Sequence, residues 1–135
     1  MFPRQYYKRV VVNRTVEPMG APQGGAFMVL DQGTLVVERT DAAFDAYRLR
    51  CFPANNEETE IIVPLSTVRD IRQTNTRSEN GTFLDMGTVC FCVDSIRENI
   101  PSQEIYECKM NRADSRDLCD KLKHIEHTQR EDRHV

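Results

Sequence analysis

The sequence predicts a mainly β domain, in which about seven antiparallel strands form a bent barrel or sandwich capped by one C-terminal helix. Through most of the chain, apolar and polar residues alternate, which is the period of a half-buried strand. Only the C-terminal part carries apolar residues at helical spacing. The chain has 135 residues, of which 39% are hydrophobic and 29% are charged. It is therefore long enough for one domain with its own core.

The expected strands follow one another as a meander. They cover the ranges 7–16, 26–30, 34–38, 46–52, 60–74, 82–96 and 103–110. In the first, Val10, Val12 and Val16 share a face, with Lys8 and Arg14 on the same side toward its ends. The second and third flank Asp-Gln-Gly, which suits the tight turn of a hairpin.

Alternation also assigns the faces of the later strands. In 46–52, Tyr47, Leu49 and Cys51 face one side, and the residues between them face the other. In 60–74, Pro64 places the strand at a sheet edge or a bend, because proline has no N–H for a central ladder. The segment 82–96 is the longest apolar stretch, so we expect it to be a central strand.

The C-terminal segment predicts an amphipathic helix. Leu118, Leu122 and Ile125 recur at helical spacing, and Asp114 or Ser115 suits its N-cap. We expect the domain to span residues 1–128, followed by a polar tail at 129–135. A short sheet with two apolar faces must close on itself, so the helix is expected to plug an open end.

This order of elements resembles the pleckstrin-homology-like superfold, which includes the PH, phosphotyrosine-binding (PTB) and GRAM-like branches. The resemblance covers nearly the whole chain and rests on the stretches AFMVLDQGTLVVE, IIVPLSTVRDI and YECKM…LCDKLKHI. It implies a non-catalytic interaction module that binds either a peptide or a lipid headgroup. It also implies that a peptide would add as a strand beside the C-terminal helix.

Composition and motifs exclude several classes of function. The net charge of −3 argues against a nucleic-acid partner, which would favour a basic excess. The chain has no nucleotide-binding or nucleophile-elbow motif. Its three histidines all lie near the C-terminus, so we expect neither an enzyme nor a cofactor. The first residues lack the pattern of a secretory signal. We therefore expect a cytoplasmic protein. A further option is peripheral association with membranes or the cytoskeleton.

The thiols of Cys90 and Cys92 raise the question of a metal or redox site. Residues i and i+2 of a strand share a face at a Cα separation of about 6–7 Å, which suits a disulfide poorly. A structural zinc site needs four ligands, and no second cysteine pair is present. Cys108 on a neighbouring strand leaves a three-thiol cluster open. We expect packing on a second, covered face, and no metal.

Basic residues on the first strands suggest phosphoinositide or membrane-surface binding as one hypothesis. The candidates are Lys8, Arg9, Arg14, Arg48 and Arg50. Arginine in such a patch can bond phosphate oxygens in pairs. The alternative is a strand face on which these charges are solvated or paired with acids such as Glu38.

A sheet edge that binds a protein or peptide partner is the preferred hypothesis. Val63, Pro64 and Leu65 mark the candidate edge, and Arg69 and Arg72 just beyond it suit an acidic or phosphorylated ligand. The alternative is a protected edge, because proline hinders strand addition. A chain of this size also suits one subunit of a larger assembly. The sequence does not predict the oligomeric state.

Overall fold

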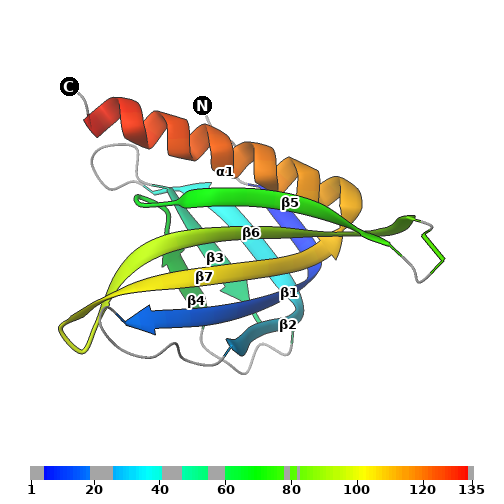
Figure 1. Ribbon diagram of the computed structural model, residues 1–135, viewed down its shortest axis with the longest axis horizontal. Coiled ribbons are helices and arrows are strands. Elements are labelled where there is room, and N and C mark those ends of the chain that lie inside the picture. The colour runs from blue at the N-terminus through cyan, green and yellow to red at the C-terminus, as the bar shows by residue number, and fades with distance from the viewer. Residues whose placement is uncertain are drawn as a thin grey trace.

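The structure, a computed structural model, describes residues 5–18, 26–40, 47–54, 60–77, 80–81 and 83–133. The elements in chain order are β1 (Gln5–Pro18), β2 (Ala26–Arg39), β3 (Tyr47–Phe52), β4 (Ile61–Pro64), β5 (Arg69–Arg77), β6 (Phe83–Arg97), β7 (Ile100–Asn111) and α1 (Arg112–Arg133). The predicted fold class is confirmed: seven antiparallel strands curl into a half-barrel that carries one C-terminal helix (Figure 1).

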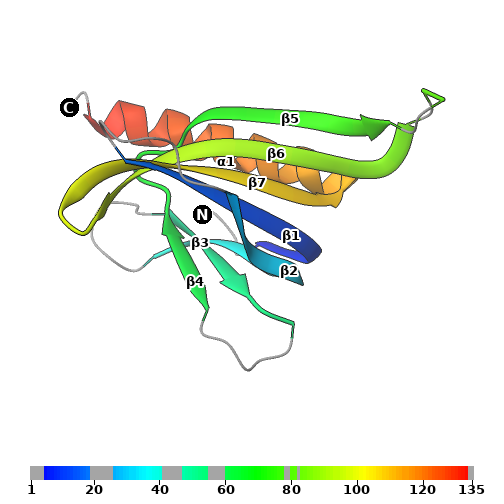
Figure 2. The same cartoon turned by 60° about the horizontal axis from the view of Figure 1, so that its bottom comes forward.

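The strand order across the sheet is β4-β3-β2-β1-β7-β6-β5. The long strand β1 joins two meanders, because its first part pairs only with β2 and its second part pairs with both β2 and β7. Figure 2 shows β3 and β4 folding away from β5, β6 and β7. The two edges of the sheet are thus β4 and β5, which are consecutive in the chain.

One continuous core fills the concave side of the half-barrel, and alternation predicted it well. Tyr47, Leu49 and Cys51 are buried, as expected for the inner face of β3. Phe91 on β6 and Tyr106 on β7 stack with their ring centroids 5.2 Å apart. The helix packs on β5, β6 and β7, and its predicted apolar residues Leu118, Leu122 and Ile125 are fully buried in the same core.

The predicted hairpin at Asp-Gln-Gly is wrong, because β2 runs through it as one strand. Gln32 adopts φ = 54°, and the pairs Val10↔Gly33 and Val12↔Leu30 leave one extra residue on β2. The three residues therefore form a bulge that bends the strand. A Cβ on Gly33 would lie 2.5 Å from the Phe52 carbonyl oxygen, so close strand approach requires glycine here.

The predicted strand at 60–74 is divided into β4 and β5 by a turn. Leu65 N–H donates to the Tyr47 carbonyl at 3.0 Å, and Val68 N–H donates to the Leu65 carbonyl at 3.2 Å. The predicted number of strands nevertheless agrees with the structure, since one expected hairpin became a single strand and one expected strand became two.

A second bulge changes the face assignment of β1. Arg9 has φ = 56°, and the register shifts between Tyr7 and Val10. As a result, Tyr7 and Val10 are both fully buried, whereas Lys8 and Arg9 both face solvent. The prediction that Lys8 shares the face of Val10 is therefore wrong.

The helix begins earlier and ends later than predicted. The Asn111 side-chain oxygen accepts from the N–H groups of Ala113 (2.8 Å) and Asp114 (3.4 Å), so Asn111 is the N-cap rather than Asp114 or Ser115. At the other end, α1 continues to Arg133. Residues 129–133 of the expected polar tail are therefore helical.

Candidate functional site

The edge strand β5 runs beside α1, and the two elements are antiparallel (Figure 1). Gln73 on β5 donates a hydrogen bond to the hydroxyl of Ser115, near the start of the helix, at 3.1 Å. Arg69, at the start of β5, lines a pocket together with Gln129, near the end of the helix. Pockets therefore open beside β5 at two positions along α1, and the region between strand and helix that includes them is named here the groove.

The outer edge of β5 has no neighbouring strand among the described residues, since β5 ends the strand order and pairs with β6 alone. On such an edge every second residue points its N–H and C=O away from the sheet. Asp70 has φ = 55° within a bulge between Arg69 and Arg72. The regular part of the open edge is therefore Arg72–Asn75.

A polar contact anchors the helix to β1. The Tyr7 hydroxyl donates to Asp117 at 2.7 Å, and the Lys121 ammonium lies 2.6 Å from the same oxygen. Burial pushes the pKa of Asp117 upward, but the hydrogen bonds from Lys121 and Tyr7 outweigh burial and hold that pKa below its ordinary value. Burial and the neighbouring carboxylate raise the pKa of Tyr7, so Tyr7 acts as a neutral donor.

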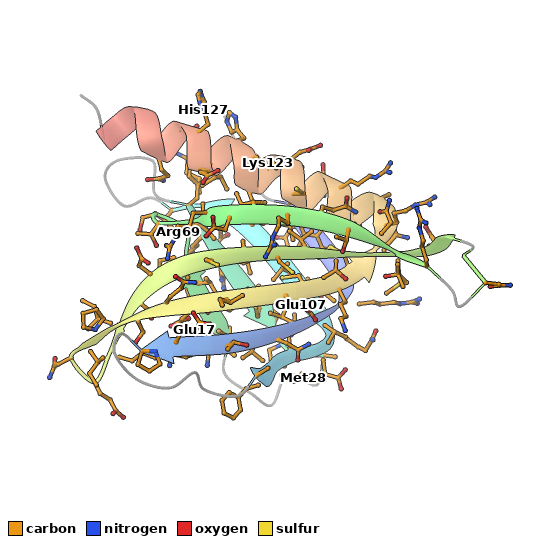
Figure 3. The ribbon with its side chains drawn as sticks, viewed as in Figure 1. Glu17, Met28, Arg69, Glu107, Lys123 and His127 are labelled. Carbon is orange, nitrogen blue, oxygen red and sulfur yellow. The ribbon has the colours of Figure 1, made fainter. Side chains whose placement is uncertain are left out.

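Two pockets lie along the groove. The first, named here the helix-start pocket, has a volume of about 260 Å³ and is lined by Gln73, Arg116, Cys119, Asp120 and Lys123. The second, the helix-end pocket, has a volume of about 160 Å³ and is lined by Ser66, Thr67, Val68, Arg69, Asp94, Glu126 and Gln129. Figure 3 places Lys123 on the helix and Arg69 at the start of the adjacent strand.

The two pockets differ in charge. The helix-start pocket holds two cations, Arg116 and Lys123, and one carboxylate, Asp120. In the helix-end pocket the balance is reversed: Asp94 and Glu126 accompany one guanidinium, that of Arg69. Arg69 bonds Asp94 at 2.7 Å. The two pockets therefore present different sets of charged side chains.

Of the seven predicted basic residues, Arg69 and Arg72 lie on β5. Arg69 lines the helix-end pocket, and its guanidinium also donates to Gln103 at 2.9 Å. Arg72 is exposed and pairs across the ladder with Cys90, on the outer face of the sheet. The site residues predicted from the sequence did not include Arg116, Asp120 and Lys123. Their spacing of four and three residues, on the flank of the apolar stripe, is the signal that identifies them.

The predicted edge residues Val63, Pro64 and Leu65 lie in and just after β4, which is an edge strand. Val63 and Leu65 are buried in the core, and Pro64 is exposed. β4 has only four residues and ends on a proline, both of which protect an edge from strand addition. The edge that lies beside the helix is β5.

Arg48 and Arg50 do not form a free basic patch, because Glu38 lies between them. The Arg48 and Arg50 guanidiniums approach the same Glu38 oxygen at 2.8 and 3.1 Å, and Arg50 also bonds Glu60 at 2.7 Å. The side chain of Glu38 is 4% exposed. These arginines therefore neutralise a buried carboxylate on the outer face of β2 and β3.

The three basic residues of β1 do not share one surface. The ammonium of Lys8 lies 5.9 Å from the centre of the Tyr6 ring, and Arg9 follows it in the bulge. Arg14 instead lies near the hydroxyl of buried Tyr106, where burial raises the pKa of the phenol and the Arg14 charge opposes that rise. Lipid binding by Lys8, Arg9, Arg14, Arg48 and Arg50 together thus lacks a single continuous site.

The thiols occupy both sides of the sheet. Cys108 is fully buried on the inner face, opposite Val89, whereas Cys90 and Cys92 share the outer face. A cluster of these three thiols is therefore not formed. Cys92 is 8% exposed beneath neighbouring strand side chains rather than beneath a second layer of described structure. Burial raises the pKa of both Cys90 and Cys92, which lowers their reactivity.

Within the described ranges, no three residues among His, Cys, Asp and Glu gather to hold a metal ion. The helix described here lacks the apolar length that crossing a bilayer requires. No family model, no curated protein and no solved structure matches the chain. The function must accordingly be argued from the groove itself.

Proposed function

We propose that this protein is a non-catalytic interaction module that binds an extended segment of a partner protein as an added strand on β5. The segment would lie in the groove between β5 and α1. Its backbone would bond the edge, and its alternate side chains would enter the pockets on the helix side. In this function the module resembles the PTB branch of the pleckstrin-homology-like superfold.

The observation that carries this proposal is the open edge of β5 beside a pocketed helix. Backbone groups on the edge supply affinity that is independent of ligand sequence, and the pockets supply selection among side chains. The other edge, β4, offers a short strand that ends on proline. At β5, an open edge and two pockets therefore lie side by side.

Proline substitutions on the two edges test this function. Successive residues of an antiparallel strand point their N–H groups in opposite directions, so either Thr74→Pro or Asn75→Pro removes an outward N–H and leaves the ladder to β6 intact. The variant that keeps the parent's circular dichroism and melting temperature is the informative one. The matched control is the tolerated member of the pair Ile61→Pro and Ile62→Pro on β4.

Affinity purification of each variant from lysate, read by quantitative mass spectrometry, gives the result. We expect at least one partner that the parent and the β4 control recover equally and the folded β5 variant loses by tenfold or more. Equal recovery by all three proteins would show that the β5 edge does not bind the partner.

A further inference from the structure

The register of β5 constrains the segment that adds to it, and this inference rests on the proposed function. We propose that the bound segment carries two consecutive acidic residues. One of them pairs across the edge with Gln73, and its carboxylate enters the helix-start pocket. The other pairs with Arg72, and its carboxylate meets the Arg72 guanidinium on the outer face of the sheet.

Gln73 and Arg72 point to opposite faces of the sheet. Gln73 pairs across the ladder with Val89, which is fully buried on the inner face. Arg72 pairs with Cys90, on the outer face, and both residues of β5 lie beyond its bulge. Residues directly opposite each other on paired strands share a face. Two successive ligand residues at these positions therefore point one to the helix side and one to the outer side.

The helix-side position opens on the helix-start pocket, which Gln73 lines together with four residues of α1. Its volume of about 260 Å³ lies below the range of small-molecule sites, so the pocket suits a single side chain. Within the described part of the chain, the side chains of Arg116 and Lys123 form no ion pair or hydrogen bond. A carboxylate that enters gains these two cations and meets one anion, Asp120. The pocket therefore favours an acid over a base or a neutral amide of the same size.

The outer position faces Arg72, whose side chain is exposed and has no ion pair among the residues that the structure describes. The two nearest charged residues of β5 are engaged with other groups. Arg69 bonds Asp94 at 2.7 Å, and the Asp70 carboxylate lies 3.9 Å from the Arg69 guanidinium. An acid directly opposite Arg72 forms a cross-strand pair of opposite charge, which stabilises a sheet, whereas a base at the same position is repelled.

The two acids are neighbours in the ligand because Gln73 and Arg72 are neighbours in β5. Two acids separated by one residue would share a face, so only one of them would reach its cation. Reversing the direction of the ligand exchanges which acid comes first and leaves them adjacent. The adjacency of the two acids is therefore the property to test.

A displayed library of random twelve-residue peptides, selected on the full chain, tests the inference. We expect enriched peptides to carry two consecutive acids. Two synthetic peptides of identical composition, one with adjacent glutamates and one with a single residue between them, are then compared by fluorescence anisotropy. The adjacent pair should bind about two- to fivefold more tightly, as one partly exposed charge pair allows.

Two charge-neutralising variants assign each acid to its cation. The variant Arg116→Gln, Lys123→Gln should lose the preference for glutamate over glutamine at one of the two peptide positions. The variant Arg72→Gln should lose that preference at the other position. The matched control Lys8→Gln, Lys109→Gln removes two exposed cations from β1 and β7 and should leave both preferences unchanged.

The outcomes separate this inference from the proposed function. Enriched peptides that lose binding on the β5 proline substitution but show no preference for adjacent acids would refute the inference and leave strand addition standing. The same conclusion holds if both glutamate preferences persist in the charge-neutralising variants. If no peptide is enriched, or if binding ignores the proline, strand addition is wrong and the inference falls with it.

Discussion

Replacing Gly87 with alanine should destabilise the protein by forcing the start of α1 away from the sheet. A Cβ at this position of β6 would overlap the Ser115 hydroxyl and lie 3.0 Å from Ser115 Cβ and 3.2 Å from Gln73 Nε2. Ser115 is fully buried and bonded both to Gln73 and to the Arg112 carbonyl. Neither Ser115 nor Gln73 can move away from the added methyl group without losing a hydrogen bond.

The magnitude follows from three contributions. Overpacking costs about 1–3 kcal/mol, and loss of the Gln73–Ser115 hydrogen bond costs about 1 kcal/mol. Alanine in a strand regains about 0.5–1 kcal/mol relative to glycine. The net loss in free energy of unfolding is about 2 kcal/mol, which shifts a urea midpoint by about 1 M at the usual slope.

Urea unfolding followed by circular dichroism measures this loss, and Ser115→Ala supplies the control. Removing the hydroxyl relieves the worst overlap, so Gly87→Ala should cost at least about 1 kcal/mol less in the Ser115→Ala background. An equal cost in both backgrounds would refute the reasoning, because the clash would then lie elsewhere. Arg116 follows Ser115 in α1 and lines the helix-start pocket. Gly87→Ala alone should therefore displace Arg116 and weaken the peptide binding proposed above.

Three further predictions concern the Tyr7 anchor of the helix, the helix N-cap and two carboxylates whose pKa values are lowered. Tyr7→Phe should lose about 1–2 kcal/mol of stability, because it removes a hydrogen bond to a charged acceptor; urea unfolding checks this, and parent-like stability would contradict it. Asn111→Ala should lower the free energy of unfolding by about 1 kcal/mol through loss of the N-cap. Asn111→Asp, which can still cap the helix, should retain most of the parent's stability in the same assay. Because the pKa values of Asp117 and Glu104 lie below their ordinary range, their stabilisation is present above the unfolded pKa of about 4. It is lost as pH falls through the folded values, so urea midpoints should drop between pH 5 and pH 3, and less steeply in Asp117→Asn.

The sequence predicts the faces of β3 correctly, and the same alternation is seen in β6 and β7, because alternation depends on neighbouring residues alone. Leu49, Phe91 and Cys108 face the core as their local patterns require. The helix stripe follows for the same reason, with a different period. Local periodicity thus recovers the fold class and most of the core.

Asp31–Gly33 shows where local patterns fail. A tight turn and a bulge both need a residue with positive φ, so the same sequence suits either. The choice depends on β1, where the Arg9 bulge and Val10 keep the pairing in register. Such long-range pairing is invisible in a short window.

The groove could be predicted only in part. The apolar stripe predicts which side of α1 faces the core. It thereby also predicts that Arg116, Asp120 and Lys123 lie at the margin of that side. Their role depends on β5 lying beside them, which in turn depends on the turn that divides 60–74 into two strands. The position of the open edge is therefore a property of the tertiary structure.

The arginines of β3 show why a count of basic residues misjudges a surface. Arg48 and Arg50 look available in the sequence, yet both bond Glu38, whose side chain is 4% exposed. A phosphate group that captured them would leave a buried carboxylate without its counter-charges, and an uncompensated buried charge costs several kcal/mol. Arg116 and Lys123 face no such cost, because they line an open pocket. The outer face of β3 is therefore an unfavourable place for a phosphate-bearing lipid headgroup to bind, and this cost is our reason for proposing a peptide ligand instead.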